Sequence, residues 1–196
     1  MNIIERVKNI LITPKTEWEV INGETATAQS LLMSYVLPLS VIGAAGTLLK
    51  GLLFAGTFSW GLKFFIVGAV IALVASVVAY YITVILVDML APSFASEKDM
   101  GKSAQLVAYS GTASYIGALL SFVPVVGWLI SLAAWAYGIY LMYLGIGPLK
   151  KTPEDKKVVY MLVVYVIMIV LYFVLVAILG AILYAAMGMT AGSMFR

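Results

Sequence analysis

Residues 145–176 read GIGPLKKTPEDKKVVYMLVVYVIMIVLYFVLV, in which a short charged segment separates two apolar runs. The run that begins at Val158 contains no charged side chain before Arg196. It is longer than the roughly 20 apolar residues that a transmembrane helix needs. Composition agrees, because 63% of the 196 residues are hydrophobic and 11% are charged. In soluble domains roughly half of the residues are hydrophobic and about a quarter are charged. The sequence therefore predicts an integral membrane protein.

Five apolar windows are long enough to cross a bilayer, and polar or proline-containing breaks separate them. They cover residues 31–49, 64–86, 104–123, 126–146 and 158–187. Helices are expected, because the strands of a barrel would be short alternating segments and these runs are unbroken. We predict an all-α, polytopic integral membrane protein with five transmembrane helices in residues 30–196. A cytoplasmic segment, residues 1–29, precedes them and contains a short amphipathic helix.

The N-terminal segment carries the amphipathic pattern. Its apolar side chains recur at helical spacing before Pro14, where the helix should end: Ile3, Ile4, Val7, Ile10 and Leu11. Such a helix either lies in the membrane interface, with Trp18 as an anchor just after it, or packs its apolar face on the membrane domain. In both cases the side chains of Ile4, Val7 and Leu11 are predicted to be covered.

The distribution of lysine and arginine predicts the orientation in the membrane. Nine of these residues lie in the N-terminal segment and after the second and fourth spans, against three on the other side. The N-terminus is therefore expected in the cytoplasm and the C-terminus outside, and no signal peptide is expected. The turn LKKTPEDKK serves most simply to hold this topology, with Pro148 and Pro153 blocking helix continuation. The alternative is that Lys150 and Lys151 bind an anionic lipid head group.

The chain offers few side chains for enzymatic chemistry. It contains no histidine and no cysteine, which removes Ser-His and Cys-His nucleophile pairs and the usual zinc ligand sets. We therefore expect no enzymatic activity, no metal or other cofactor and no nucleic-acid partner. Asp88 is the one acid attached to a predicted span. It is expected at the interface or in an ion pair with Lys98 or Lys102, or else in the functional role that ionisable residues in spans usually have.

Four segments stand out in order along the chain: PKTEWEVI at 14–21, QLVAYSGTASYIGAL at 105–119, VPVVGW at 123–128 and YGIYLMYLGIGPL at 137–149. Together they resemble the Yip family, a five-span domain named for its interaction with Ypt/Rab GTPases, and in particular its bacterial branch. The resemblance implies a cytoplasmic N-terminus and five helices. In the eukaryotic members it also implies a role in organising membrane traffic through contacts with GTPases and with other family members.

Two features set this chain apart from that family pattern. The Asp-Leu-Tyr-Gly-Pro element before the spans is absent, and the Gly-Tyr pair in the third span is matched only by Ala108 and Tyr109. These residues therefore give GTPase binding no support. Given this resemblance, the short N-terminal segment favours a bacterial inner membrane location.

Two classes of function remain open. The first is a non-enzymatic scaffold or adaptor that binds other membrane proteins, or copies of itself, through its helices and its cytoplasmic face. The second is a small permeation or lipid-handling protein in which the polar side of residues 104–123 lines a pathway. Under both hypotheses Tyr109, Ser110, Thr112 and Ser114 are predicted to face the interior of the bundle, because hydroxyl groups are costly against lipid.

Overall fold

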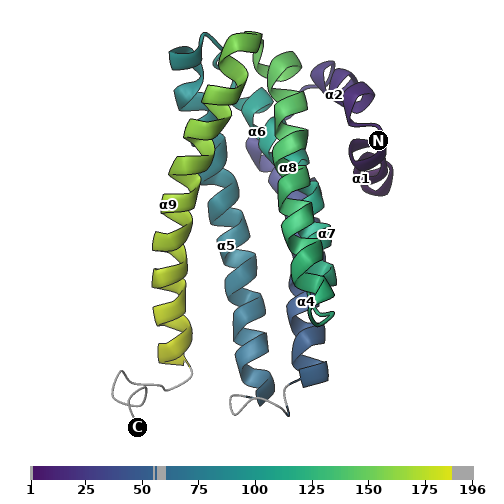
Figure 1. Ribbon diagram of the computed structural model, residues 1–196, viewed down its shortest axis with the longest axis vertical. Coiled ribbons are helices and arrows are strands. Elements are labelled where there is room, and N and C mark those ends of the chain that lie inside the picture. The colour runs from purple at the N-terminus through teal and green to yellow at the C-terminus, as the bar shows by residue number, and fades with distance from the viewer. Residues whose placement is uncertain (1, 55, 57–60, 187–196) are drawn as a thin grey trace.

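The computed structural model describes residues 2–54, 56 and 61–186, and every regular element among them is helical (Figure 1). The elements are α1 (Ile3–Ile12), α2 (Pro14–Asn22), α3 (Ala28–Leu31), the π-helical η1 (Leu32–Val36), α4 (Leu37–Phe54), α5 (Gly61–Leu90), the 3₁₀-helical η3 (Ala91–Phe94), α6 (Met100–Ser110), α7 (Thr112–Leu120), α8 (Val126–Lys150) and α9 (Glu154–Ala186). The prediction of an all-α protein is confirmed. The expected end of the last span, at Met187, lies outside the described residues.

Within the described residues, four helical stretches are long and apolar enough to cross a membrane: Ala28–Phe54, Gly61–Phe94, Val126–Lys150 and Glu154–Ile182. They match the first, second, fourth and fifth predicted spans, and they support a multi-pass membrane protein. The predicted span at 104–123 is divided into α6 and α7, which meet at Gly111. At this break the hydroxyl of Thr112 donates a hydrogen bond to the carbonyl of Tyr109, a group that an unbroken helix would use in its own ladder.

Glycines let the helices of the membrane domain pack closely. A methyl group on Gly46 of α4 would lie 2.6 Å from the carbonyl oxygen of Leu119 in α7. A methyl group on Gly117 of α7 would lie 2.6 Å from the Cβ atom of Ala134 in α8. Both distances are shorter than any normal contact, so α4, α7 and α8 approach each other at a separation that larger residues would not allow.

The last helix, α9, packs much less tightly than the others. Only 6% of the residues in its most apolar window are buried, against 50% for Ala28–Phe54. In Figure 1, α9 and α8 begin close together at the turn that joins them and diverge along the long axis of the molecule. Most of the apolar surface of α9 is therefore left for lipid or for a partner.

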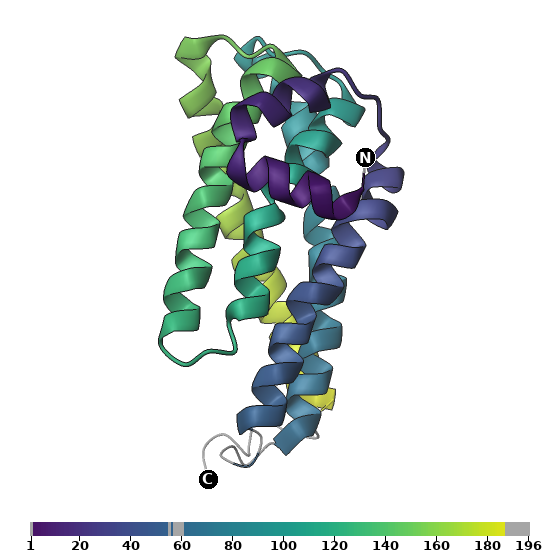
Figure 2. The same ribbon diagram turned by 90° about the vertical axis from the view of Figure 1, so that its right-hand side faces the viewer.

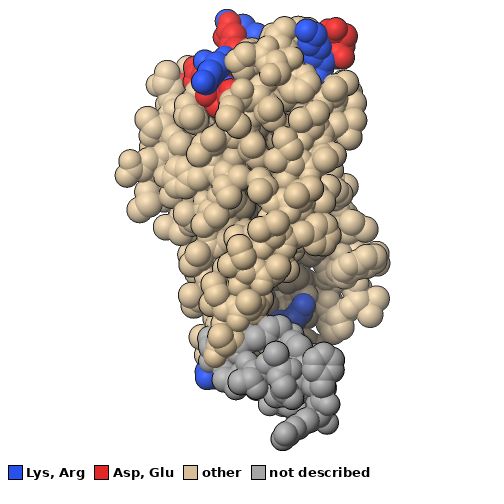
Figure 3. All heavy atoms as spheres, turned by 90° about the vertical axis from the view of Figure 1, so that its left-hand side faces the viewer, with Lys and Arg blue, Asp and Glu red and all other residues tan. Residues whose placement is uncertain are grey.

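Charged side chains gather at one end of the molecule, as the space-filling view shows (Figure 3). We call this the charged end; it carries the connection between α5 and α6 and the turn between α8 and α9. On the face shown, the opposite end carries lysine or arginine without acidic residues. This distribution agrees with the sequence, in which all the acidic residues lie in residues 5–24, 88–99 and 154–155.

The two N-terminal helices pack on the membrane domain, and Figure 2 shows α1 and α2 lying across the half of the bundle nearer the charged end. The hydroxyl of Tyr137 in α8 donates a 2.8 Å hydrogen bond to the carbonyl of Leu11. Of the two predicted placements, packing on the domain is the observed one. The predicted face was wrong in part, because Ile4 is 73% exposed whereas Arg6 is 4% exposed. Arg6 can be buried because acidic partners surround it.

Candidate functional site

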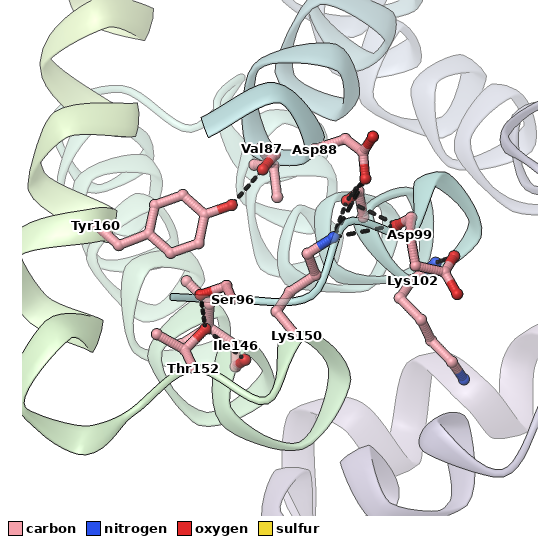
Figure 4. Close-up of polar contacts among 10 residues, drawn as sticks. Val87, Asp88, Ser96, Asp99, Lys102, Ile146, Lys150, Thr152 and Tyr160 are labelled. Atoms are coloured by element: carbon pink, nitrogen blue, oxygen red, sulfur yellow. Dashed lines mark hydrogen bonds and ion pairs between the residues drawn. The ribbon is translucent and has the colours of Figure 1, made fainter. Parts of the chain in front are cut away.

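A buried ion pair connects three helices at the charged end (Figure 4). The Nζ atom of Lys150, the last residue of α8, lies 3.3 Å from Oδ1 of Asp88 in α5. It also donates hydrogen bonds to the hydroxyl of Ser103, at 2.7 Å, and to the carbonyl of Asp99, at 3.1 Å. Asp88 accepts a second hydrogen bond from Ser103, at 3.1 Å. The ammonium and carboxylate groups therefore satisfy each other away from solvent.

Local structure brings these groups together. The side chain of Asp99 caps α6 by accepting a 2.9 Å hydrogen bond from the N–H of Lys102, and this places Ser103 on the first turn of the helix. Lys151 adopts a left-handed conformation with φ 49°, which ends α8 directly after Lys150. The chain thus directs Lys150 inward and Lys151 outward, where Lys151 pairs with exposed Glu97 at 2.7 Å.

These positions correct three predictions from the sequence. Lys150 is 0% exposed, so it neither lies in a solvated turn nor reaches a lipid head group. Asp88 pairs with Lys150 instead of Lys98 or Lys102, and Lys102 donates to the carbonyls of Asn22 and Glu24. The physical reason is that Lys150 is the last residue of the apolar helix α8, so its side chain lies in the core. A charge in the core needs a buried partner.

The proline prediction was also wrong at one position. Pro148 does not block α8, which continues through it to Lys150. Only two residues follow the proline within the helix, and the carbonyl of Ile146 accepts a 3.2 Å hydrogen bond from the hydroxyl of Thr152. The proline removes only the hydrogen bond that its N–H would donate to the carbonyl of Leu144, and the hydroxyl of Thr152 adds a side-chain cap near the end of the helix.

The turn after the ion pair is joined to the rest of the charged end by further hydrogen bonds. The N–H of Glu97 donates to the carbonyl of Lys150 at 2.8 Å. The hydroxyls of Ser96 and Thr152 lie 2.8 Å apart, and the hydroxyl of Tyr160 in α9 donates to the carbonyl of Val87 in α5. The ends of α5 and α8 and the start of α9 are therefore held in one arrangement.

A second buried charge holds the N-terminal helices. A guanidinium nitrogen of Arg6 lies 2.5 Å from a carboxylate oxygen of Glu17, and another pairs with Glu24. The same guanidinium lies 5.2 Å from the ring centroid of Tyr109 in α6. Burial by itself lowers the pKa of Arg6, but the hydrogen bond to Glu24 and the neighbouring negative charges outweigh it and raise that pKa. Arg6 therefore stays charged.

Trp18 completes this contact from α2. It is 1% exposed and meets the ring of Tyr109 edge-on, with the centroids 6.3 Å apart. A methyl group on Gly145 of α8 would lie 2.6 Å from Cε2 of Trp18, so the indole fits only because that residue is glycine. The predicted role of Trp18 as an anchor in the lipid interface is corrected: its side chain lies inside the protein, because Gly145 leaves room for it.

A groove opens between α8 and α9, with α5, α6 and α7 as its floor. Its volume is about 720 Å³. Ser110, Gly111 and Ser114 line it at the break between α6 and α7, and the exposed rings of Tyr172 and Phe173 stand at its rim. Among the described residues, no charged side chain lines this groove.

Four hydroxyl-bearing residues were predicted to face the interior of the bundle. Tyr109, Ser110 and Thr112 are buried, whereas the side chain of Ser114 is exposed in the groove. Ser110 and Ser114 line the groove, whereas Tyr109 lines a different, polar pocket of about 490 Å³ beside Arg6 and Glu24. Tyr109 and Ser110 are neighbours on one helix, so their side chains point in different directions. The polar residues of 104–123 do not form one continuous lining.

Comparison of the sequence with known protein families identifies its family. The sequence matches the Yip1 domain over residues 8–178, which is most of the chain. The chain belongs to the Yip1 domain family. A search of curated proteins and a search of solved structures each found no match. The matched range of the Yip1 domain includes the Lys150–Asp88 ion pair, Trp18 and the groove, and it begins two residues after Arg6.

This Yip1 domain therefore has two polar clusters, one around Lys150 and one around Arg6, that were not predicted from the sequence. Arg6, Glu17, Glu24 and Ser103 were not predicted as members of a site. One signal was present for Lys150, because it continues the helical spacing of buried Met142 and Ile146. Among the described residues of this Yip1 domain, no three acidic side chains gather as a metal site would require.

Proposed function

We propose that this Yip1 domain is a non-enzymatic scaffold or adaptor that binds apolar segments of other membrane proteins. The observation that carries the proposal is the groove between α8 and α9, which has small residues at its floor and aromatic residues at its rim. Within the described part of the chain, no charged residue lines it. Small lining residues such as Gly111 and Ser114 permit close approach of a helix. The polar contacts around Lys150 support the proposal, because they fix the ends of α5 and α8 and the start of α9, which bound the groove.

Photo-crosslinking from the groove floor tests this proposal. A photoreactive amino acid at Ser114, which is exposed in the groove, should give discrete protein adducts in native membranes. The matched control is Val70, which is 56% exposed and lies outside the groove on α5; it should give lipid adducts alone. Lipid adducts alone at Ser114 as well would remove the basis for a protein partner in the groove.

The second candidate function is permeation or lipid handling. One observation favours it, since Ser110 and Ser114 line a groove and the side chain of Ser114 is exposed there. No charged side chain in residues 2–54, 56 and 61–186 lines the groove, and this weighs against ion transport, because selective pathways place charges or ordered carbonyls along the route.

We also propose a bacterial inner membrane location with the charged end in the cytoplasm, following the excess of lysine and arginine at that end. The chain has no cysteine of its own, so single cysteines can report the sides. Asp155→Cys in the turn after α8 should be labelled from the cytoplasm by an impermeant reagent, and Lys63→Cys at the start of α5 from the outside. Both side chains are exposed. Labelling of both from one side would contradict this orientation.

A further inference from the structure

A second groove lies between α8 and α9, with a volume of about 500 Å³. The aromatic contact between Trp135 and Tyr165, whose ring centroids are 6.4 Å apart, lies where the two grooves meet. The walls of the second groove are apolar over most of their length and include Ile139, Leu162 and Val166. Both helices are long and apolar enough to cross the membrane, so the medium that fills this groove is lipid and not water.

The groove has a polar end, which lies toward the turn between α8 and α9. There the ammonium of Lys157 lies 6.0 Å from the ring centroid of Tyr143, which lines the groove with Tyr140. A methyl group on Gly147 would lie 2.5 Å from this ammonium, so Lys157 lies directly on the backbone of α8. Its side chain is 11% exposed. The cation therefore has a fixed position at the mouth of an apolar groove.

The polar groups at this end are incompletely satisfied by the protein. The partner of Lys157 is Glu154, whose side chain is 80% exposed and stays accessible to solvent. Among the described residues, the hydroxyls of Tyr140 and Tyr143 have no hydrogen-bond partner, and the ammonium of the adjacent Lys156 has no ion pair. One cation with a fixed position, a second lysine next to it in the sequence and two free hydroxyl donors thus lie at the end of α8 and α9 where the two helices are joined.

We propose that this groove binds one phospholipid with an acidic head group. The acyl chain lies along Ile139, Leu162 and Val166, and the phosphate accepts hydrogen bonds from Lys157 and from the hydroxyls of Tyr140 and Tyr143. Lys156 adds a second positive charge, which favours a net negative head group over a zwitterionic one. The site is independent of the proposed scaffold role, since protein segments are assigned to the other groove.

Native mass spectrometry of the purified full-length protein tests this site. The probes are phosphatidylglycerol and phosphatidylcholine with identical acyl chains, added at equal concentration. The wild type should retain one phosphatidylglycerol in preference to phosphatidylcholine. Lys157→Gln should reduce phosphatidylglycerol retention about five-fold, as the loss of one lysine contact predicts. Ala136→Trp, which places a large ring at an exposed position in the groove, should reduce retention of both lipids.

Lys151→Gln is the matched control, because it removes one positive charge from the same turn at a side chain that is 70% exposed and lies away from the groove. It should retain phosphatidylglycerol as the wild type does. Equal losses for Lys151→Gln and Lys157→Gln would show attraction by overall charge and overturn the site. Equal retention of the two lipids by the wild type would overturn the choice of an acidic head group.

Discussion

Replacing Lys150 with methionine should lower the free energy of unfolding by about 3–5 kcal/mol. The substitution keeps most of the side-chain volume but leaves the carboxylate of Asp88, which is 3% exposed, without its counter-charge. It also removes the ammonium group that donates hydrogen bonds to the hydroxyl of Ser103 and to the carbonyl of Asp99. Denaturant titration of the purified protein in detergent, followed by the loss of helical signal, measures the effect.

Two further variants identify the cause of this loss. Lys151→Met removes a charge from the neighbouring exposed residue and should change the free energy of unfolding by less than about 0.5 kcal/mol. Combining Lys150→Met with Asp88→Leu should restore more than half of the lost stability, because no unpaired charge then remains in the core. If the double variant is no more stable than Lys150→Met alone, the buried pair is not what holds the charged end together.

Replacing Arg6 with methionine should release the N-terminal helices from the membrane domain. The carboxylate of Glu17, which is 4% exposed, would lose its partner, and Tyr109 would lose the cation that lies over its ring. Hydrogen bonds to charged groups contribute about 1.5–3 kcal/mol, so amide exchange in α1 and α2 should accelerate by roughly 10- to 100-fold. Exchange in α5 and α8 should stay unchanged.

Lys8→Met provides the matched control, since it removes the same charge from an exposed position on the same helix. Its amide exchange should be that of the wild type. Equal acceleration by the two variants would mean that the net charge of the segment, and not the buried contact of Arg6 with Glu17 and Glu24, keeps α1 and α2 in place.

The membrane spans could be predicted because their cause is local. A bilayer requires a continuous apolar stretch of a given length, and residues 158–182 satisfy this requirement whatever the rest of the chain does. The break at Gly111 was harder to predict, because it depends on the hydroxyl of Thr112, which reaches both the carbonyl of Tyr109 and the hydroxyl of Tyr35. A hydroxyl that takes a carbonyl from the helix backbone does not change the mean hydropathy of the segment, so hydropathy does not reveal the break.

The buried charges could not be assigned from hydropathy for a different reason. Lysine and arginine are usually exposed, and their partners here are distant in sequence: Asp88 is 62 residues from Lys150, and Glu17 is 11 residues from Arg6. Only the fold brings these pairs together. The side chains of Ser110 and Ser114 face a groove because α8 and α9 diverge, and this divergence has no signature in the sequence of α6 and α7.

In the proposed function the groove beside Ser110 and Ser114 receives a membrane partner and does not conduct. Ion flux and lipid scrambling in proteoliposomes, measured for the wild type and for Ser110→Leu combined with Ser114→Leu, distinguish this function from permeation or lipid handling. Because no charged residue lines the groove among the described residues, the wild type should show neither flux nor scrambling above empty liposomes. Robust activity that the double substitution abolishes would contradict the scaffold and establish the permeation or lipid-handling alternative.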